Sequence, residues 1–496
     1  MGSNDGYGRP YRVTLKSCVE ARRKKEQNEL RELYDSGRAE LVAVYGRRRV
    51  GKTYLINEFF GGEFAFKHTG LSPVEIKGKS LFEAQLEQFY LSLVEYGMSD
   101  ILRPKSWQEA FYLLRKLLEQ KGTEERKVVF IDELPWLDTP KSGFITGFES
   151  FWNGWASSRH DIMLIVCGSA TSWMKDKLIS NYGGLYGRVT YELYISPFTL
   201  SETEQYFKDK GIDFSRYDIA ESYMIVGGIP YYLGYFKRQL SLAQNVDELF
   251  FRPHAKLTDE FDRLFASVFI NPDRIKKIVE LLGTRRLGYT RGEIADKLKL
   301  PNNGGLSECL AALIANGFAV RYVPFGYSGK EVHFKLIDPF CLFYLHFIRN
   351  GKAHSQNYWL DNMTSQSVVT WKGFAFENLC FGHIAQIKET LMISGVDSTQ
   401  SAWSPRGAEG SDGMQIDMLI DRADNVVNLC EMKFYSNEVT VDKEMYLTMA
   451  DRKAELEKAV SRKKAVRNTL ITTYGIKKSE YASTFSNVLI IDDLFR

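Results

Sequence analysis

The sequence predicts a multidomain α/β protein, and three segments carry this prediction. The first is a glycine-rich loop between an apolar run and a helical pattern, in residues 41–60. The second is a series of three helical patterns followed by two β-rich runs, in residues 273–348. The third places carboxylates within apolar strand patterns, in residues 414–434. Because 496 residues exceed what one hydrophobic core supports, we expect several domains.

Composition favours packed globular domains. Hydrophobic residues make up 44% and aromatic residues 14% of the chain, and the net charge of +3 excludes a polyelectrolyte-type nucleic-acid binder. No apolar run approaches the roughly 18 residues that a membrane span needs, and residues 1–6 contain no apolar signal core. We therefore predict a cytosolic protein with no membrane partner. The six cysteines form no C-x-x-C pair, which favours reduced, packed thiols.

The glycine-rich loop Gly46–Thr53 fits G-x-x-x-x-G-K-[ST] and follows the apolar run Leu41–Tyr45. The helical pattern after it has an apolar side made of Tyr54, Leu55, Ile56, Phe59 and Phe60. Backbone N–H groups at a helix N-terminus bind phosphate, so this order of strand, loop and helix predicts a phosphate-binding P-loop. We expect Lys52 to reach the outer phosphates and Thr53 to hold Mg²⁺. The predicted nucleotide-binding residues are Gly46, Arg47, Arg48, Arg49, Val50, Gly51, Lys52, Thr53 and Tyr54.

A second buried strand, Lys127–Ile131, ends in the acidic pair Asp132 and Glu133. Hydrolysis of a bound triphosphate needs an acid beside Mg²⁺ and a group that polarises the attacking water. We assign the first role to Asp132 and the second to Glu133, which follows on the other side of the pleat. The alternative is an acidic pair without function at a strand end.

A third strand, Ile162–Cys167, leads to Ser169, which is placed to sense the γ-phosphate or to position water. Its alternative role is that of a helix N-cap. Further on, Arg188 follows a glycine-rich loop and precedes the apolar alternation of Tyr191, Leu193 and Ile195. Its guanidinium could stabilise charge on the transferred phosphoryl group, in its own subunit or in a neighbouring one. A surface arginine is the alternative.

Residues 201–270 read as mainly helical, which suits a lid on the nucleotide, and Gly227–Leu233 marks a tight helix start. The set of motifs resembles the archaeal-type ATPase family, of the STAND branch of AAA-like P-loop ATPases. The resemblance rests on Val44–Thr53, Phe130–Glu133, Cys167–Ser169, Gly187–Arg188 and Gly227–Leu233. It implies a five-stranded parallel core, ATP as the nucleotide, and contact between Pro230 and the adenine.

Residues 273–348 predict a winged helix-turn-helix. We expect helices over Arg274–Leu282, Thr290–Leu298 and Leu306–Asn316 and strands over Ala319–Val323 and Val332–Ile337. The third helix of a DNA-reading version offers basic or amide side chains to the major groove. Here that helix contains no Lys or Arg, and Arg291, Lys297 and Lys330 form a weak electrostatic footprint. A packing or relay module is therefore favoured over a sequence-specific DNA reader.

The C-terminal region places Glu377 on an apolar helix, Trp371–Cys380, and Asp417 on a strand, Met414–Ile420. The next strand, Val426–Phe434, carries Glu431 and Lys433 on one face, because residues two apart point the same way. Carboxylates in apolar strands are costly unless they share a metal or an ion pair. We predict Mg²⁺ binding by Glu377, Asp417 and Glu431, with Lys433 orienting the attacking water. A surface ion pair between Glu431 and Lys433 is the alternative.

This D…E-x-K arrangement resembles the PD-(D/E)XK nuclease fold and the uncharacterised C-terminal domain that accompanies these ATPases. The resemblance implies a restriction-endonuclease-like α/β domain and makes phosphodiester cleavage a hypothesis. We expect a further helix to carry seven basic residues, on a solvated face or against a nucleic-acid backbone. They are Arg452, Lys453, Lys458, Arg462, Lys463, Lys464 and Arg467. The last strands are expected at Leu470–Thr473 and Val488–Ile491.

The sequence thus predicts an ATPase coupled to a Mg²⁺-dependent nuclease domain that acts on DNA. The alternative is a nucleotide-driven switch that forms a nucleotide-dependent homo-oligomer and whose C-terminal domain binds a partner without cleavage. A transcriptional regulator that acts through the winged helix is a weaker third hypothesis. The expected domains are an arm (1–38), the ATPase core (39–200), a lid (201–272), the winged helix (273–350) and the nuclease-like domain (351–496).

Overall fold

The structure is a computed structural model that describes most of the chain. The described residues are 23–73, 76, 80–122, 125–180, 183–269, 271–327, 329, 331–349, 355–404 and 414–496. Most of the predicted arm, Cys18 and Lys330 lie outside them. The chain divides into two compact units, Met1–Pro197 with Ser267–Phe269, and Phe198–Ala266 with Ile270–Arg496. These are unit 1 and unit 2, respectively, and the finer domain boundaries stay a prediction.

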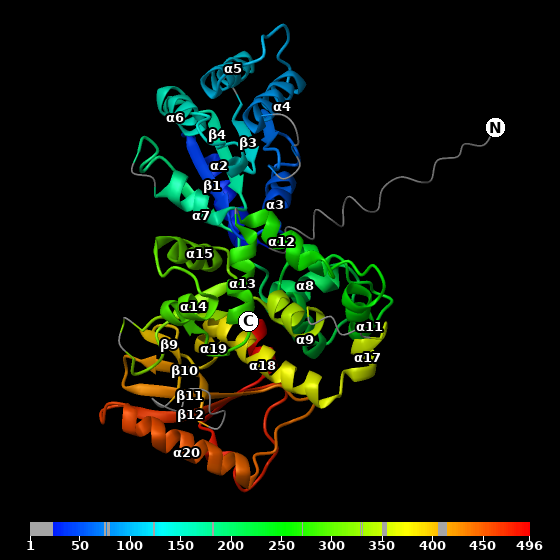
Figure 1. The fold of residues 1–496 in the computed structure, drawn as a ribbon, viewed down its shortest axis with the longest axis vertical. Coiled ribbons are helices and arrows are strands. Elements are labelled where there is room, and N and C mark those ends of the chain that lie inside the picture. Colours follow the sequence, from blue (N-terminus) through cyan, green and yellow to red (C-terminus); the bar gives the residue numbers. More distant parts are fainter. Residues whose placement is uncertain are drawn as a thin grey trace, which may run out of the picture. The chain divides into compact units, whose positions relative to one another are not determined.

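A five-stranded parallel sheet forms the centre of unit 1 (Figure 1). Its strands are β1 Glu40–Tyr45, β2 Phe66–Thr69, β3 Lys127–Asp132, β4 Ile162–Gly168 and β5 Tyr191–Tyr194. Their order across the sheet is β2-β3-β4-β1-β5, and every neighbouring pair is parallel. All residues of β1, β3 and β4 are buried, as expected for a sheet covered on both faces. The predicted parallel α/β core is confirmed.

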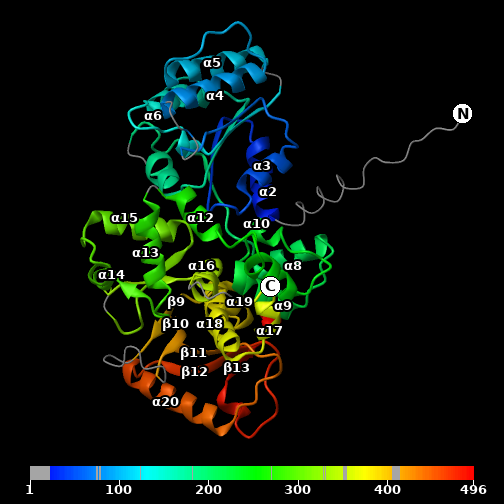
Figure 2. The same cartoon turned by 45° about the vertical axis from the view of Figure 1, so that its right-hand side comes forward.

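Helices cover this sheet. They are α2 Lys24–Asp35, α3 Lys52–Phe59, α4 Leu81–Glu95, α5 Trp107–Gln120, α6 Phe144–Gly154 and α7 Thr171–Trp173, with shorter turns η1 Leu134–Trp136, η2 Ala156–Ser158 and η3 Met174–Ile179. Helices α4, α5 and α6 lie side by side and pack aromatic residues onto one face of the sheet (Figure 2). Its aromatic members include Phe89, Trp107, Phe111, Phe144 and Trp152.

Unit 2 begins with the helical segment that the sequence predicts as a lid. It contains α8 Leu200–Asp209, α9 Arg216–Val226, α10 Pro230–Leu233, α11 Leu242–Val246, η4 Asp247–Phe251 and α12 Glu260–Val268, whose last two residues belong to unit 1. Gly227 ends α9 with a positive φ of 67°, and Pro230 occupies the first position of α10. The predicted helix start is therefore confirmed, because proline suits a position that needs no N–H donor.

The middle segment, residues 273–350, has the predicted order of elements. Its helices are α13 Pro272–Leu282, α14 Arg291–Leu298, α15 Gly304–Ala315, α16 Pro339–Phe343 and η5 Tyr344–Ile348. Its strands are β6 Tyr289–Thr290, β7 Ala319–Tyr322 and β8 His333–Leu336, in an antiparallel sheet of order β6-β8-β7. Its role as a winged helix stays a prediction.

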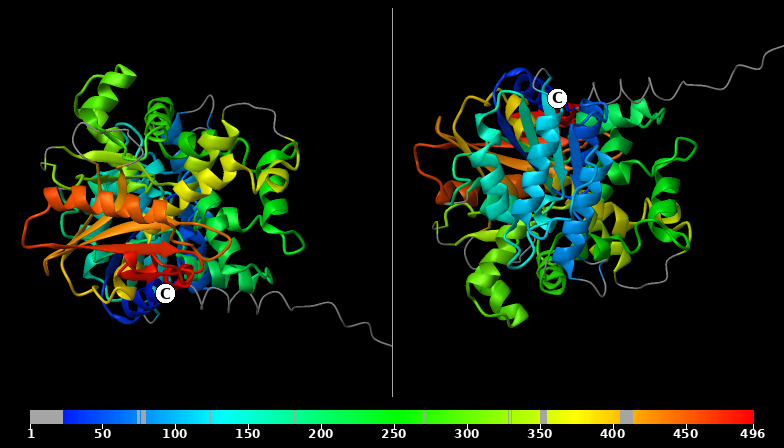
Figure 3. Two further views of the ribbon diagram at one scale, coloured as in Figure 1. Left: turned by 90° about the horizontal axis from the view of Figure 1, so that it is seen from below. Right: turned by 90° about the horizontal axis from the view of Figure 1, so that it is seen from above.

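The C-terminal region forms a second five-stranded sheet. Its elements are α17 Tyr358–Asn362, α18 Gln366–Gly382, α19 Ile384–Thr390, β9 Ser398–Trp403, β10 Ile416–Arg422, β11 Val426–Lys433, α20 Lys443–Ala459, β12 Ala465–Thr472, η6 Ala482–Thr484, β13 Asn487–Leu489 and η7 Ile491–Phe495. The order is β13-β12-β11-β10-β9, with the β9, β10 and β11 pairs antiparallel and the others parallel. The register between β9 and β10 shifts between Ile416 and Leu419. Helix α20 packs along this sheet (Figure 3).

Three sequence-based expectations need correction. Helix α20 ends at Ala459, so Arg462, Lys463 and Lys464 follow it and Arg467 lies in β12. Strands β2 and β9 were not expected. Tyr54, expected on the apolar side of its helix, is 46% exposed, because burial on α3 is carried by Leu55 and Ile56.

The five described cysteines are free thiols. Four of them, Cys167, Cys341, Cys380 and Cys430, are buried, which agrees with the predicted packed thiols. Within the described residues, no helix is long and apolar enough to cross a membrane.

Candidate functional site

The predicted phosphate loop joins the end of β1 to the start of α3. Gly46 and Gly51 have φ values of +142° and +90°, and Arg49 also has a positive φ of 74°. These conformations turn the chain sharply between strand and helix, which glycine permits at low cost. At Gly46 a Cβ atom would lie 2.3 Å from the carbonyl oxygen of Ile195, so no larger residue fits there.

Lys52, Thr53 and Asp132 meet at the edge of the sheet where β1 and β3 end. The Lys52 Nζ donates hydrogen bonds of 2.9 Å to the carbonyl oxygens of Gly46 and Arg47, which holds the ammonium across the loop. The Thr53 Oγ1 donates to Asp132 Oδ2 at 2.8 Å. Two hard oxygen donors side by side, next to a buried lysine, fit the requirements of Mg²⁺ bound with a phosphate. The residues present therefore fit the ion that the sequence predicts.

Glu133 and Ser169 form the second contact of this edge. Glu133 follows β3 in a left-handed conformation, with φ of 48°. Its carboxylate accepts hydrogen bonds from Ser169 Oγ, at 2.9 and 3.1 Å, and from the backbone N–H of Ser169 at 3.3 Å. Burial, and then the charge of Asp132, raise the pKa of Glu133, while Lys52 and the Ser169 hydrogen bonds oppose the rise. Ala170, rather than Ser169, is the N-cap of α7, so the alternative role of Ser169 is not the one observed.

The remaining predicted residues of unit 1 are more dispersed. Arg47 and Val50 are buried within the loop, and Arg48 lies over the ring of Trp136 at 5.8 Å. Arg188 is exposed in the segment before β5, where its backbone N–H bonds to Leu185. Pro230 belongs to unit 2. The predicted phosphate role of Arg188 and the adenine contact of Pro230 therefore stay predictions.

Comparisons with known proteins bear on this part of the chain. Residues 21–236 match the family of ATPase domains that come predominantly from Archaea. This ATPase domain includes the P-loop, Asp132, Glu133, Ser169, Arg188 and Pro230, and it ends before the middle segment. The match therefore makes no statement about the C-terminal carboxylates.

Individual relatives extend further along the chain. The uncharacterized protein MJECL04 of Methanocaldococcus jannaschii is 25% identical over 390 residues, which cover 78% of this chain and 82% of that protein. Among solved structures, the Walker-type ATPase PABY2304 of Pyrococcus abyssi is 21% identical, covers 65% of this chain and 95% of that chain, and has a TM-score of 0.44. The ORC2 protein of Aeropyrum pernix, in ADPNP–ADP complexes, is 13% identical, with coverages of 73% and 98% and a TM-score of 0.40.

In unit 2, Glu377 and Asp417 lie together around one arginine. Arg286, from the turn between α13 and β6, places its Nη1 3.6 Å from Glu377 Oε2 and 3.9 Å from Asp417 Oδ2. Gln415 donates a short hydrogen bond to the other oxygen of Asp417. Burial, and then Asp417, raise the pKa of Glu377 to about 8, while Arg286 and Lys335 oppose the rise. Glu377 and Asp417 are called the acid pair below.

Glu431 forms a second charge cluster with two cations. Lys433 Nζ lies 2.7 Å from Glu431 Oε1, and Arg452 Nη1 lies 2.6 Å from Glu431 Oε2. Burial lowers the pKa of Lys433, but the charge of Glu431, the hydrogen bond that Glu431 accepts from Lys433 and the charge of Tyr435 together outweigh this effect, so the pKa is raised overall. Arg452 is only 14% exposed, so it does not belong to a solvated helix face as the sequence suggested. The charge of Glu431 also acts on Glu377, which puts the two clusters within electrostatic range.

Sequence reasoning missed Arg286, Lys335 and the ion pair of Arg452. Lys335, on β8, is 4% exposed and lies over the ring of Phe381 at 5.0 Å. Burial lowers the pKa of Lys335, whereas Asp417 and Glu377 favour its charged form. No local sequence pattern predicts these contacts, because the cations and the carboxylates belong to segments that are far apart in the sequence.

The three predicted metal carboxylates of unit 2 do not form a single cluster here. Across the described ranges, no group of three or more His, Cys, Asp or Glu side chains is placed to hold a metal ion. Glu377 and Asp417 share one arginine, and Glu431 is held by its own two cations. Mg²⁺ binding by these carboxylates therefore stays a prediction, supported by an oxygen donor set that already attracts positive charge.

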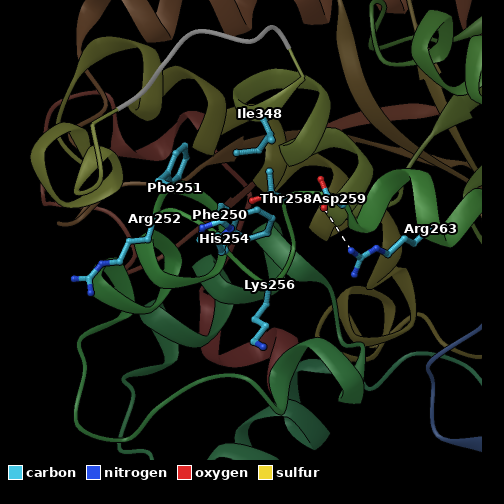
Figure 4. Close-up of a pocket in the computed structure, with 10 residues that line it drawn as sticks. Phe250, Phe251, Arg252, His254, Lys256, Thr258, Asp259, Arg263 and Ile348 are labelled. Carbon is cyan, nitrogen blue, oxygen red and sulfur yellow. Dashed lines mark hydrogen bonds and ion pairs between the residues drawn. The ribbon is translucent and has the colours of Figure 1, made fainter.

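A pocket of about 670 Å³ lies elsewhere in unit 2 (Figure 4). Its lining combines apolar residues with basic ones, namely Phe250, Phe251 and Ile348 with Arg252, His254, Lys256 and Arg263. No site residue predicted from the sequence lines it. It is therefore separate from both candidate sites.

Proposed function

We propose that the chain binds and hydrolyses ATP at the loop Gly46–Thr53. The observation that carries this proposal is the 2.8 Å contact between Thr53 Oγ1 and Asp132 Oδ2, beside Lys52 and Glu133. The ATPase-domain family match supports it. Mg²⁺ held by Thr53 and Asp132 would neutralise charge on the phosphate oxygens.

Different residues of this chain would bind the phosphates and activate the attacking water. The backbone N–H groups at the start of α3 would receive the phosphates, and Lys52 would turn from the loop carbonyls toward the outer phosphate oxygens. Glu133 would orient the attacking water and accept its proton, while Ser169 keeps the carboxylate of Glu133 in one orientation. Arg188 is exposed, which suits a role on the nucleotide of its own chain or of a second copy.

The test is steady-state ATP hydrolysis by the full chain and two variants. Lys52→Ala should weaken nucleotide binding and hydrolysis together, and Glu133→Gln should retain binding while lowering kcat by about 100-fold. Lys67→Ala, which removes a lysine of strand β2 that donates a hydrogen bond to Asn57 of α3, serves as the control and should hydrolyse ATP normally. Hydrolysis that persists in Glu133→Gln would overturn the assignment of the base.

For the C-terminal region, the proposed function is metal-dependent cleavage of DNA. The observation that supports it is the placement of Glu377 on α18, of Asp417 on β10, and of Glu431 with Lys433 on the neighbouring strand β11, as the D…E-x-K pattern requires. In this scheme Glu377, Asp417 and Glu431 would hold Mg²⁺, which would activate water toward the phosphodiester. Lys433 would orient that water from its place beside Glu431.

The second candidate is a nucleotide-driven switch in which this region binds a partner without cleavage. It is favoured by one observation, the pairing of Glu431 with Lys433 and Arg452 within the chain. The two functions differ in a nicking assay with supercoiled DNA, ATP and Mg²⁺. Nicking by the wild type that is lost in Glu431→Gln, with ATP hydrolysis retained, supports the nuclease. Absence of nicking, together with ATP-dependent formation of homo-oligomers, supports the switch.

A further inference from the structure

The acid pair of unit 2 is contacted by a cation from a different segment of the chain. Arg286 lies within 4 Å of a carboxylate oxygen of Glu377 and of Asp417. Its guanidinium also stacks 4.1 Å from the ring centroid of Phe374, which lies one helical turn before Glu377 on α18. Three contacts from one side chain fix the arginine against the acid pair, so the contact is not that of a loose surface residue.

Lys335 supplies a second positive charge from the middle segment. It lies on β8, almost fully buried, with its ammonium over Phe381 near the end of α18. Asp417 and Glu377 are the charges that act on it most strongly. Arg286 and Lys335 both belong to the middle segment, whereas Glu377 and Asp417 belong to the C-terminal region. The middle segment thus supplies cations to carboxyl groups of a different part of unit 2.

A divalent cation and Arg286 would compete for this place. Mg²⁺ needs carboxylate oxygens about 2.1 Å away, and Mn²⁺ has similar preferences. The Nη1 of Arg286 already lies 3.6 Å from Glu377 Oε2 and 3.9 Å from Asp417 Oδ2, in the space beside both carboxylates. Like charges at such short range repel strongly in a partly buried site. Ion binding therefore requires the arginine to leave, and with it the turn that carries Arg286.

We propose that Arg286 of the middle segment occupies the cation position of the acid pair and, together with Lys335 over Phe381 on the same helix α18, keeps the C-terminal site closed to a divalent ion. The inference rests on the proposed metal-dependent function and concerns how metal binding at that site is regulated. The segment that the sequence predicted as a relay acts as an inhibitory plug. Any event that displaces the turn between α13 and β6 opens the site.

The test is Mn²⁺ binding to the full chain by isothermal titration calorimetry, without nucleotide or DNA. Arg286→Ala should bind Mn²⁺ about tenfold more tightly than the wild type, because a competing charge is removed. The additional binding should disappear in Arg286→Ala/Asp417→Asn. Arg321→Ala removes an exposed positive charge from β7 of the same segment and should behave like the wild type. Arg286→Gln and Lys335→Met, which retain side-chain volume, should show the same tightening if the alanine variant folds poorly.

The outcomes separate the inference from the function on which it rests. Equal Asp417-dependent affinity in the wild type and in the Arg286 and Lys335 variants overturns the plug and leaves the metal-dependent function standing. Absence of Asp417-dependent binding in every folded variant overturns both. Tightening in Arg321→Ala as large as in Arg286→Ala also overturns the plug, because a general charge effect would then explain the result.

Discussion

Lys372 and Glu221 form a buried ion pair of 2.9 Å that joins helix α18 to helix α9. Their side chains are 6% and 5% exposed, and Glu221 also accepts a hydrogen bond of 3.2 Å from the indole N–H of Trp359. Helix α18 carries Glu377, and α9 belongs to the helical segment at the start of unit 2. The pair therefore ties one residue of the acid pair to the predicted lid.

Removing one partner of this ion pair should destabilise unit 2 more than removing both. Lys372→Met leaves the carboxylate of Glu221 buried without its cation, which costs about 3–5 kcal/mol. Lys372→Met/Glu221→Gln leaves no isolated charge and should recover part of that loss. Hydrogen exchange of peptides from α9 and α18 measures the local free energy of opening. A single variant that exchanges like the wild type would show that the ion pair contributes little.

Ser169 should act on hydrolysis through the orientation of Glu133. Ser169→Ala removes the hydroxyl that donates to both carboxylate oxygens. A hydrogen bond to a charged group is worth roughly 1.5–3 kcal/mol, so kcat should fall about tenfold or more. Nucleotide affinity, measured by fluorescent-analogue titration, should stay within about twofold. A loss of affinity equal to the loss of kcat would instead place Ser169 in direct contact with the phosphates.

Burial of His68 makes the stability of unit 1 depend on pH. His68 lies on β2, 1% exposed, with Nδ1 2.9 Å from Ser92 Oγ, and burial lowers its pKa to about 3. In the unfolded chain the imidazole of His68 binds a proton near pH 6.5, whereas in the folded chain it stays neutral at this pH. The free energy of unfolding therefore falls as the pH drops below about 6.5. Between pH 7 and pH 5 the loss should be about 2 kcal/mol.

Urea unfolding of the full chain at both pH values checks this prediction. His68→Phe keeps an aromatic ring beside Phe66 and Phe89 and should lose that part of the pH dependence. His160→Ala, at an exposed position, should retain it. The same pH dependence in all three proteins would contradict the role of His68.

The close approach of Gly46 to β5 should make this glycine sensitive to substitution. Gly46→Ala places a Cβ 2.3 Å from the Ile195 carbonyl oxygen, at a φ that side chains rarely adopt. The overlap should cost about 1–3 kcal/mol and weaken ATP binding, because the loop must move. Gly61 also has a positive φ, of +61°, but the space around it is open. Gly61→Ala should therefore lower the stability of the protein without weakening ATP binding. Thermal unfolding with and without ATP measures both effects.

The sequence predicted three parallel strands of unit 1 well because each is a short, fully buried apolar run. The expected runs Leu41–Tyr45, Lys127–Ile131 and Ile162–Cys167 correspond to β1, β3 and β4. The loop between β1 and α3 was predictable as well, since its glycines, lysine and threonine follow a fixed spacing. Strand β2, Phe66–Thr69, escaped notice because it has only four residues, of which two are charged or titratable.

Other expectations failed for identifiable reasons. Tyr54 is apolar enough to suggest burial, yet it lies on the outer side of α3. The basic run after Lys453 suggested one long helix, but Val460 has an extended conformation that ends α20. Arg452 was grouped with solvated lysines, although its position on α20 brings it to Glu431. In each case the residue type was compatible with two environments, and packing selected one.

The sequence by itself determined the fully buried strands β1, β3 and β4 and the residues of the phosphate loop, because burial and fixed residue spacing are local properties that a pattern records. Only the tertiary structure decided which charges meet. Glu133 accepts a hydrogen bond from Ser169, and Arg286 lies beside the acid pair, although these residues are far apart in the sequence. Electrostatic interactions depend on distance through space and not on separation along the chain.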